Sequence, residues 1–77
     1  PEGHLLLIAH QDKPGAIGRL GNLLAERDVN IATMQVGRKT IGGKAIMMLT
    51  IDRPLTKEEL ADISSVDEFE SVSEVDL

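Results

Sequence analysis

The sequence predicts an α+β domain in which two helices cover one face of a four-stranded antiparallel sheet, in the order βαββαβ. Three observations lead to this prediction. Two segments combine helix start signals with apolar residues at helical spacing, and four other segments are rich in apolar and β-branched residues. With 77 residues, the chain has room for one small domain only.

The first strand and the first helix are separated by a short turn. The range His4–His10 contains five consecutive apolar residues, as expected of a strand buried at the centre of a sheet. A Pro-Gly turn follows at residues 14–15. Apolar residues at i, i+3 and i+7 from Ile17 then form one stripe, so a helix is expected to run to about Arg27.

Two glycines lie inside this predicted helix. Gly18 and Gly21 are three residues apart, and each costs about 1 kcal/mol of helix stability relative to alanine. They leave a bare strip of backbone on one side of the helix. Two interpretations remain open, which are a local weakness and the close approach of a ligand or partner.

The second and third strands are joined by a glycine-containing segment. In Val29–Val36 the apolar residues change parity, which a bulge near Ile31–Ala32 or burial on both faces would explain. Lys44–Asp52 carries apolar residues on both faces, so both faces of this strand need cover. The glycines of Gly37–Gly43 permit a hairpin turn between the two strands.

The second helix has a clear start signal. Thr56 and Glu59 have the spacing of a capping box, and Leu55 and Leu60 have the spacing of a hydrophobic staple. The helix is expected to end near Ser64.

A last, weaker strand is expected over Phe69–Leu77, which completes the ferredoxin-like arrangement. In this arrangement the helices leave one face of the sheet open, yet the third strand offers apolar residues to both faces. We therefore expect a second copy or another domain to cover the open face, and the chain to form at least a dimer. Replacing an outward-facing member of the pair Ile46 and Met48 with a charged residue is expected to produce monomers.

Composition and charge narrow the possible functions. The net charge is −5, with seven Lys/Arg against five Asp/Glu in residues 1–55 and one against eight in residues 56–77. This balance and the single aromatic residue argue against nucleic-acid binding. The longest apolar runs, Leu5–Ala9 and Ala45–Leu49, are far shorter than the ~20 residues of a membrane span. Because the first residue is Pro1 rather than Met, the chain is expected to be part of a larger protein.

The sequence offers little for catalysis. It has no cysteine, which excludes disulfides, thiolate metal sites and cysteine nucleophiles. It has only two histidines, no H-x-x-x-H pair and no nucleotide-binding glycine motif. We expect no catalytic residue and no metal in this chain.

A candidate binding site lies between His10 and Gly18. Free backbone N–H groups at the helix start suit a carboxylate, Asp12 suits an ammonium group, and Asn30 can donate and accept hydrogen bonds. Together these groups complement the carboxylate and the ammonium group of a small amino acid. The alternatives are that Asp12 only stabilises the turn or caps the helix, that Asn30 satisfies a turn after Asp28, and that His10 is an ordinary strand-end histidine.

Three segments closely resemble the ACT domain family: H-Q-D-K-P-G-A-I-G (10–18), V-N-I-A-T-M-Q-V-G-R-K (29–39) and G-G-K-A-I-M-M-L-T-I-D (42–52). The resemblance covers nearly all 77 residues, and the D-x-P-G-x-[IL] turn followed by a V-N-I strand is fairly specific to the family. ACT domains are βαββαβ regulatory modules that bind amino acids, usually between two paired domains.

Within this family, residues 31–39 and the terminal V-D-L are most similar to the C-terminal domain of an NAD-dependent dehydrogenase of L-serine biosynthesis. The resemblance implies L-serine as the ligand, homo-oligomers through ACT–ACT pairing, no cofactor in this domain, NAD in the parent enzyme and a cytoplasmic location. The ACT domain of an iron–sulfur-dependent L-serine dehydratase and a ligand-free assembly module remain alternatives. By position, the resemblance implies a ligand site at His10, Asp12, Gly15, Asn30 and Ile31.

Overall fold

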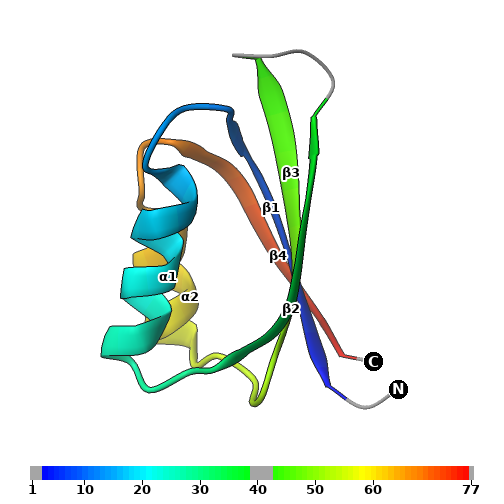
Figure 1. Cartoon of the computed structure of the whole chain (residues 1–77). Helices are drawn as coiled ribbons and strands as arrows, with labels where there is room; N and C mark the ends of the chain where they lie inside the picture. The colour runs from blue at the N-terminus through cyan, green and yellow to red at the C-terminus, as the bar shows by residue number, and fades with distance from the viewer. Residues whose placement is uncertain (1–2, 39–42, 77) are drawn as a thin grey trace.

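The computed structural model describes residues 3–38 and 43–76, in which four strands form an antiparallel sheet and two helices lie on one of its faces (Figure 1). The strands are arranged β2-β3-β1-β4, so β2 and β4 are the edges of the sheet. This confirms the predicted ferredoxin-like βαββαβ fold. Along the chain the elements are β1 (His4–Gln11), α1 (Ala16–Glu26), β2 (Ile31–Arg38), β3 (Lys44–Ile51), α2 (Lys57–Ser64) and β4 (Phe69–Asp76).

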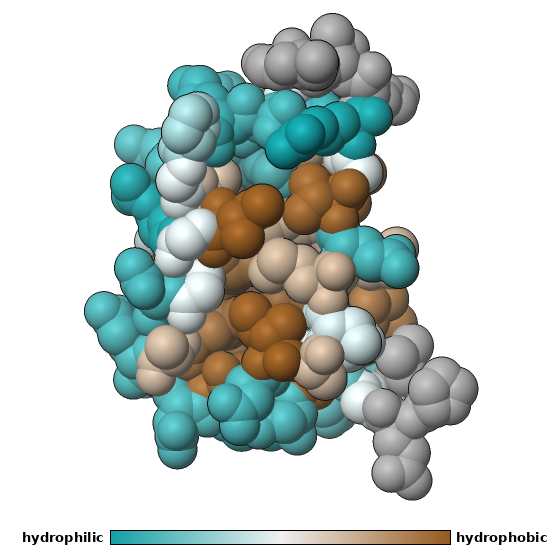
Figure 2. Space-filling model, in the orientation of Figure 1, coloured by the Kyte–Doolittle hydropathy of each residue, from teal (hydrophilic) through white to brown (hydrophobic). Residues whose placement is uncertain are grey.

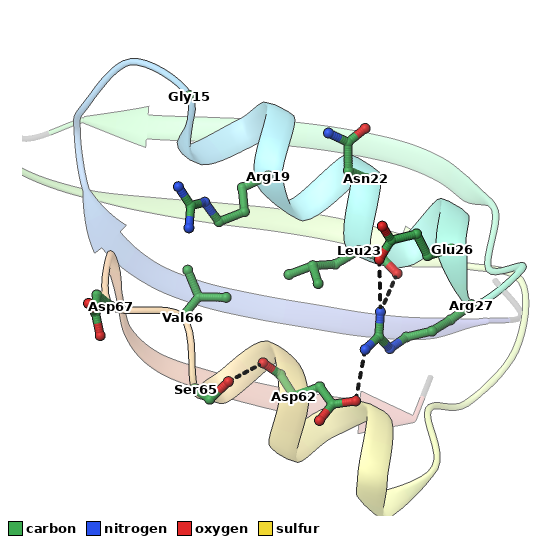
Figure 3. A pocket seen from close by; sticks show the side chains of 10 residues that line it. All are labelled: Gly15, Arg19, Asn22, Leu23, Glu26, Arg27, Asp62, Ser65, Val66 and Asp67. Carbon is green, nitrogen blue, oxygen red and sulfur yellow. Dashed lines mark hydrogen bonds and ion pairs between the residues drawn. The ribbon is translucent and has the colours of Figure 1, made fainter.

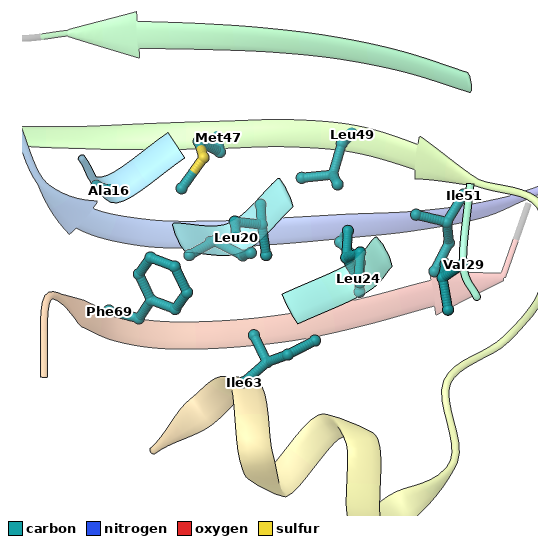
Figure 4. Packing of buried hydrophobic residues seen from close by; sticks show 11 residues of the cluster. Ala16, Leu20, Leu24, Val29, Met47, Leu49, Ile51, Ile63 and Phe69 are labelled. Carbon is teal, nitrogen blue, oxygen red and sulfur yellow. The ribbon is translucent and has the colours of Figure 1, made fainter. Parts of the chain in front are cut away.

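The core lies between the sheet and the helices (Figure 4). Leu20 and Leu24 of α1 point into it, as the predicted stripe requires. Ile17 does not, because its side chain is 41% exposed, and the prediction for this residue is wrong. Ala16 is buried instead, so the buried positions of α1 recur every fourth residue from Ala16, and Ile17 lies at the margin of the stripe.

The parity change in the second strand is caused by a bulge, as one of the two explanations predicted. Ile31 lies opposite Ile51 and Thr33 lies opposite Thr50, so Ala32 is an extra residue on β2. The strand begins at Ile31 rather than at the predicted Val29. Val29 instead donates its N–H to the carbonyl of Leu24 and so belongs to the turn that ends α1.

The two faces of β3 differ in their surroundings. Ala45, Met47, Leu49 and Ile51 are buried against the helix layer, whereas the intervening Ile46 and Met48 are 53% and 44% exposed. The sequence predicted apolar residues on both faces but left open which set faces the helices. The odd-numbered set does so, and the described part of this chain leaves the even-numbered set uncovered.

The second helix begins with the predicted capping box. Thr56 Oγ1 accepts a hydrogen bond from the Glu59 N–H at 3.1 Å, and Glu59 Oε1 accepts one from the Thr56 N–H at 2.8 Å. Leu55, which precedes the cap, packs against the core as a partly buried residue. The predicted end at Ser64 is also confirmed.

Two predicted segments extend beyond what the structure describes. Gly37 and Arg38 belong to β2 and Gly43 directly precedes β3, but the tip of the predicted hairpin, residues 39–42, lies outside the described residues. The same holds for residue 77 at the end of the last strand. Within residues 3–38 and 43–76, neither helix is long and apolar enough to cross a membrane.

Candidate functional site

The turn between β1 and α1 presents backbone N–H groups at the start of the helix. Gly15 is the N-cap residue, with a left-handed φ of 91°, and it provides no side chain to cap the first turn. Asp12 is held in this turn by its own N–H, which donates to the carbonyl of Gly43 at 2.7 Å. The interpretation of Asp12 as the helix cap is therefore wrong, because the cap position is Gly15 and α1 has no side-chain cap.

His10 lies at the end of β1, on the side that faces the helices. Its side chain is only 1% exposed. Nδ1 lies 2.9 Å from the carbonyl oxygen of Gln11, and because a carbonyl only accepts, Nδ1 must carry the proton. Nε2 is buried and has no hydrogen-bond partner among the described residues, and it is an acceptor whenever the ring carries its one proton on Nδ1. Such an atom suits a hydroxyl or N–H donor from a bound molecule.

Asp12 and Arg38 connect this turn to the end of β2. Arg38 Nε lies 3.1 Å from Asp12 Oδ2, and the Asp12 side chain is only 16% exposed. Arg38 is not among the site residues predicted from the sequence. Its proximity depends on the sheet register, in which Arg38 and His10 both lie opposite Ala45.

Asn30 and Ile31 lie at the other end of the sheet. The Asn30 N–H and its Nδ2 both donate to the Asp52 carboxylate, at 3.1 and 3.2 Å, and the Asn30 carbonyl accepts from the Asp52 N–H at 3.1 Å. Ile31 lies opposite Ile51. Asp52, which was not predicted as a site residue, holds Asn30 at the start of β2 and leaves the Asn30 side-chain oxygen as an acceptor.

The structure therefore divides the predicted ligand site into two halves. His10, Asp12 and Gly15 lie together at the end of the sheet where Ala45 pairs with β1. Asn30 and Ile31 lie at the end marked by Ile51, six residues further along β3. Six residues of a strand span about 20 Å, so the two halves cannot touch one small amino acid within a single chain.

A separate groove of about 770 Å³ lies between the two helices (Figure 3). Both arginine side chains that line it form ion pairs, Arg27 with Asp62 at 2.8 Å and Arg19 with Glu68 at 3.4 Å. Gly15 is the one residue that this groove shares with the predicted ligand site. Among residues 3–38 and 43–76, no group of three or more His, Asp or Glu residues could hold a metal ion.

The sequence profile of the ACT domain family matches residues 4–68. The chain belongs to the ACT domain family. A solved structure supports the fold, since the ACT domain of GTP pyrophosphokinase from Chlorobium tepidum superposes with a TM-score of 0.72 at 19% sequence identity. That superposition covers 97% of this chain and 100% of the other. The family assignment and the order of elements confirm the resemblance found in the sequence.

Among curated relatives, D-3-phosphoglycerate dehydrogenase from Bacillus subtilis is 52% identical to this ACT domain over 77 residues. The match covers all of this chain and 15% of that enzyme, so the chain spans about one seventh of the relative's length. The beta chain of a probable L-serine dehydratase from Bacillus subtilis is 31% identical over 70 residues, which are 91% of this chain and 32% of that protein.

Proposed function

We propose that this ACT domain is the L-serine-binding regulatory domain of a cytoplasmic, NAD-dependent D-3-phosphoglycerate dehydrogenase, and that serine binds between two copies of it. The observation that carries the proposal is the division of the ligand site between the two ends of the sheet. A site of this kind becomes complete when a second copy brings the missing half alongside.

The edge strand β2 provides the geometry for such a pair. Because β2 is an edge, a two-fold axis can pair it antiparallel with β2 of a second copy. The start of one β2 then lies beside the end of the other. Asn30 precedes the start, and Arg38 at the end is ion-paired with Asp12. This arrangement brings Asn30 of one copy near Asp12 of the other.

The same side of the molecule carries apolar surface that such a pair would bury. Figure 2 shows apolar atoms gathered between α1 and β2, with hydrophilic residues around them. Ile17 of α1 is exposed, and Ile31, Met34 and Val36 of β2 are only partly buried. Pairing through β2 and α1 would remove these side chains from water, which favours association.

Each group of the composite site has a role that its chemistry suits. The Asp12 carboxylate binds the ammonium group of serine, and the first-turn N–H groups after Gly15 bind its carboxylate together with Asn30. The buried Nε2 of His10 accepts a hydrogen bond from the serine hydroxyl. Ile31 provides apolar contact beside Asn30.

Serine binding would regulate the parent enzyme by a population shift. A ligand that contacts both copies favours the paired arrangement over others, in proportion to its difference in affinity between them. The paired arrangement would then restrain the catalytic domains. NAD and the substrate would bind to those domains, outside this chain.

Calorimetric titration with L-serine and L-alanine tests the ligand site. Asp12→Ala and Asn30→Ala are each expected to weaken serine binding by roughly ten- to a hundredfold, because a hydrogen bond to a charged group contributes about 1.5–3 kcal/mol. His10→Leu is expected to weaken the binding of serine more than that of alanine. Asn22→Ala, in the groove between the helices, is the control and should bind serine like the wild type. Unchanged serine affinity in both Asp12→Ala and Asn30→Ala would contradict the site.

Two alternatives give different results. A wild-type chain that pairs but binds no amino acid would be a ligand-free assembly module. The ACT domain of an L-serine dehydratase is the second candidate, favoured by the 31% identity to such a protein. The residues upstream of this domain separate the two enzymes, since a dinucleotide-binding G-x-G-x-x-G motif there belongs to the dehydrogenase.

A further inference from the structure

The face of the sheet opposite the helices, called the outer face below, is apolar at its centre. Its side chains alternate along each strand with those of the core, and in Figure 1 the helices lie on the other side of the sheet. Ile46 and Met48 of β3 are 53% and 44% exposed, and Val75 of β4, on the other side of β1, is 44% exposed. Three large apolar side chains exposed on one face of a sheet are characteristic of an interaction surface. The apolar residues of the outer face are Leu5, Leu7, Ala9, Ile46, Met48 and Val75.

Charged side chains on the outer face lie at one end. Lys44 and Glu70 lie there, 4.0 Å apart, with opposite charges. Towards the other end the polar side chains are neutral, and Thr33 and Thr50 bond to each other at 2.7 Å. In a chain of which 27% is charged, a neutral centre is the composition expected of an interface core.

A hollow and a protrusion lie next to each other on this face. A groove of about 450 Å³ is lined by apolar or small residues together with three charged ones: Ala9, Gly37, Ala45 and Ile46, and Arg38, Lys44 and Glu70. A side chain at Gly37 would meet nothing within 4 Å, so this glycine leaves space on β2 directly opposite the exposed Ile46 of β3. A surface with an adjoining hollow and protrusion can fit a copy of itself across a two-fold axis, because the protrusion of each copy enters the hollow of the other.

We propose that the outer face binds the outer face of a second copy of this chain, sheet against sheet. The area of the outer face is large enough to bind a second copy. Strands of eight residues are about 27 Å long and four strands are about 19 Å wide, so each face offers about 500 Å². Two faces together bury about 1,000 Å², the lower limit of a specific interface. Two edge-paired dimers, if joined in this way, would bury about twice that area and form a tetramer.

Sedimentation equilibrium of the 77-residue chain tests this interface, because the chain encloses its own core and has no cysteine to form disulfides. Met48→Glu is expected to weaken face-to-face association by on the order of a hundredfold, since it buries an unpaired carboxylate at the centre of the contact. Ile46→Lys introduces the opposite charge and is expected to have the same effect. Asn22→Glu adds a charge on the helix side and should associate like the wild type.

The outcomes also separate this interface from pairing through β2. If both interfaces exist, the wild type is a tetramer and Met48→Glu is a dimer that still binds serine. If only the outer face pairs, the wild type is a dimer and Met48→Glu is a monomer. A monomeric wild type at high concentration, or folded Met48→Glu and Ile46→Lys variants that associate like the wild type, would overturn the proposal. Circular dichroism establishes the folding of each variant, and if one is unfolded the other decides.

Discussion

Asp12 and Asn30 lie at opposite ends of the same sheet, each held by an ionic partner on a neighbouring segment. Asp12 pairs with Arg38 at the end of β2, and Asn30 donates to Asp52 just beyond the end of β3. An amino acid that uses both residues must therefore contact two chains. This relationship makes a mixing experiment more informative than either single variant.

An equal mixture of Asp12→Ala and Asn30→Ala chains, dissociated and reassembled, is expected to recover serine binding. In a mixed pair, one of the two sites combines an intact Asp12 with an intact Asn30. Half of the pairs are mixed, so about one quarter of the wild-type number of high-affinity sites should return. Calorimetry gives this number directly. A mixture that binds no better than its components would mean that no site is shared between chains.

The capping box of α2 offers a direct test of local stability. Thr56→Ala removes the oxygen that accepts the Glu59 N–H, and is expected to lower the free energy of unfolding by about 1 kcal/mol. Thr56→Ser keeps the hydroxyl and serves as the control. Urea unfolding followed by circular dichroism measures both variants. An equal loss in Thr56→Ser would show that the hydroxyl hydrogen bond is not the cause.

Glu59 is expected to make stability depend on acidic pH. Its hydrogen bonds from the Arg53 guanidinium, at 2.9 and 2.8 Å, and from the Thr56 N–H lower the pKa of this carboxyl from 4.5 to about 2. Because the pKa is lower in the folded chain, the contribution to stability is complete above about pH 4.5. It is lost as the pH falls from 4.5 towards 2.

The corresponding measurement compares the wild type with Glu59→Gln by urea unfolding between pH 7 and pH 2. The variant keeps a side chain that can complete the capping box but loses the charge that binds Arg53. The difference in stability between the two chains is expected to shrink as the pH falls. Glu58→Gln removes a charge from the same helical turn and is the matched control. A difference that stays constant down to pH 2 would contradict the role of the Arg53–Glu59 pair.

The sequence predicts the elements of this fold because their signals are local. The capping box of Thr56 and Glu59 and the parity change at Ile31–Ala32 can be recognised from residues a few positions apart, and both features are present in the structure. The second strand was predicted to begin at Val29 but begins at Ile31, and this difference also has a local cause. Asp28 adopts a left-handed φ of 60°, which returns the Val29 N–H to the end of α1 and delays the strand.

The candidate site is less predictable because it depends on the register of strands far apart in the sequence. The polar residues of the β1–α1 turn are adjacent in the chain, so their proximity follows from the sequence. Arg38 joins them only because it and His10 both lie opposite Ala45 on β3. For the same reason, residue types alone cannot reveal that Asn30 lies about 20 Å away from His10 within one chain.

The two glycines of α1 allow the last test, because they separate helix stability from pairing. A methyl group at either Gly18 or Gly21 would meet nothing within 4 Å in this chain. Alanine at each position is therefore expected to raise the free energy of unfolding by about 0.5–1 kcal/mol, through the better helix propensity of alanine. Urea unfolding at low protein concentration without serine measures this gain.

The two glycines lie on different sides of α1, which distinguishes the two positions. Gly21 follows Ile17 by four residues and lies on the same side of the helix, next to the apolar surface between α1 and β2, whereas Gly18 is exposed and lies further round the helix. If pairing through β2 brings a second copy against this side, the methyl group of Gly21→Ala occupies space that the partner needs. Gly21→Ala is then expected to be more stable as a chain but to bind serine more weakly, while Gly18→Ala gains stability and binds serine like the wild type. Equal serine affinity in both variants would mean that Gly21 is only a weak point of the helix and that the two copies do not approach each other there.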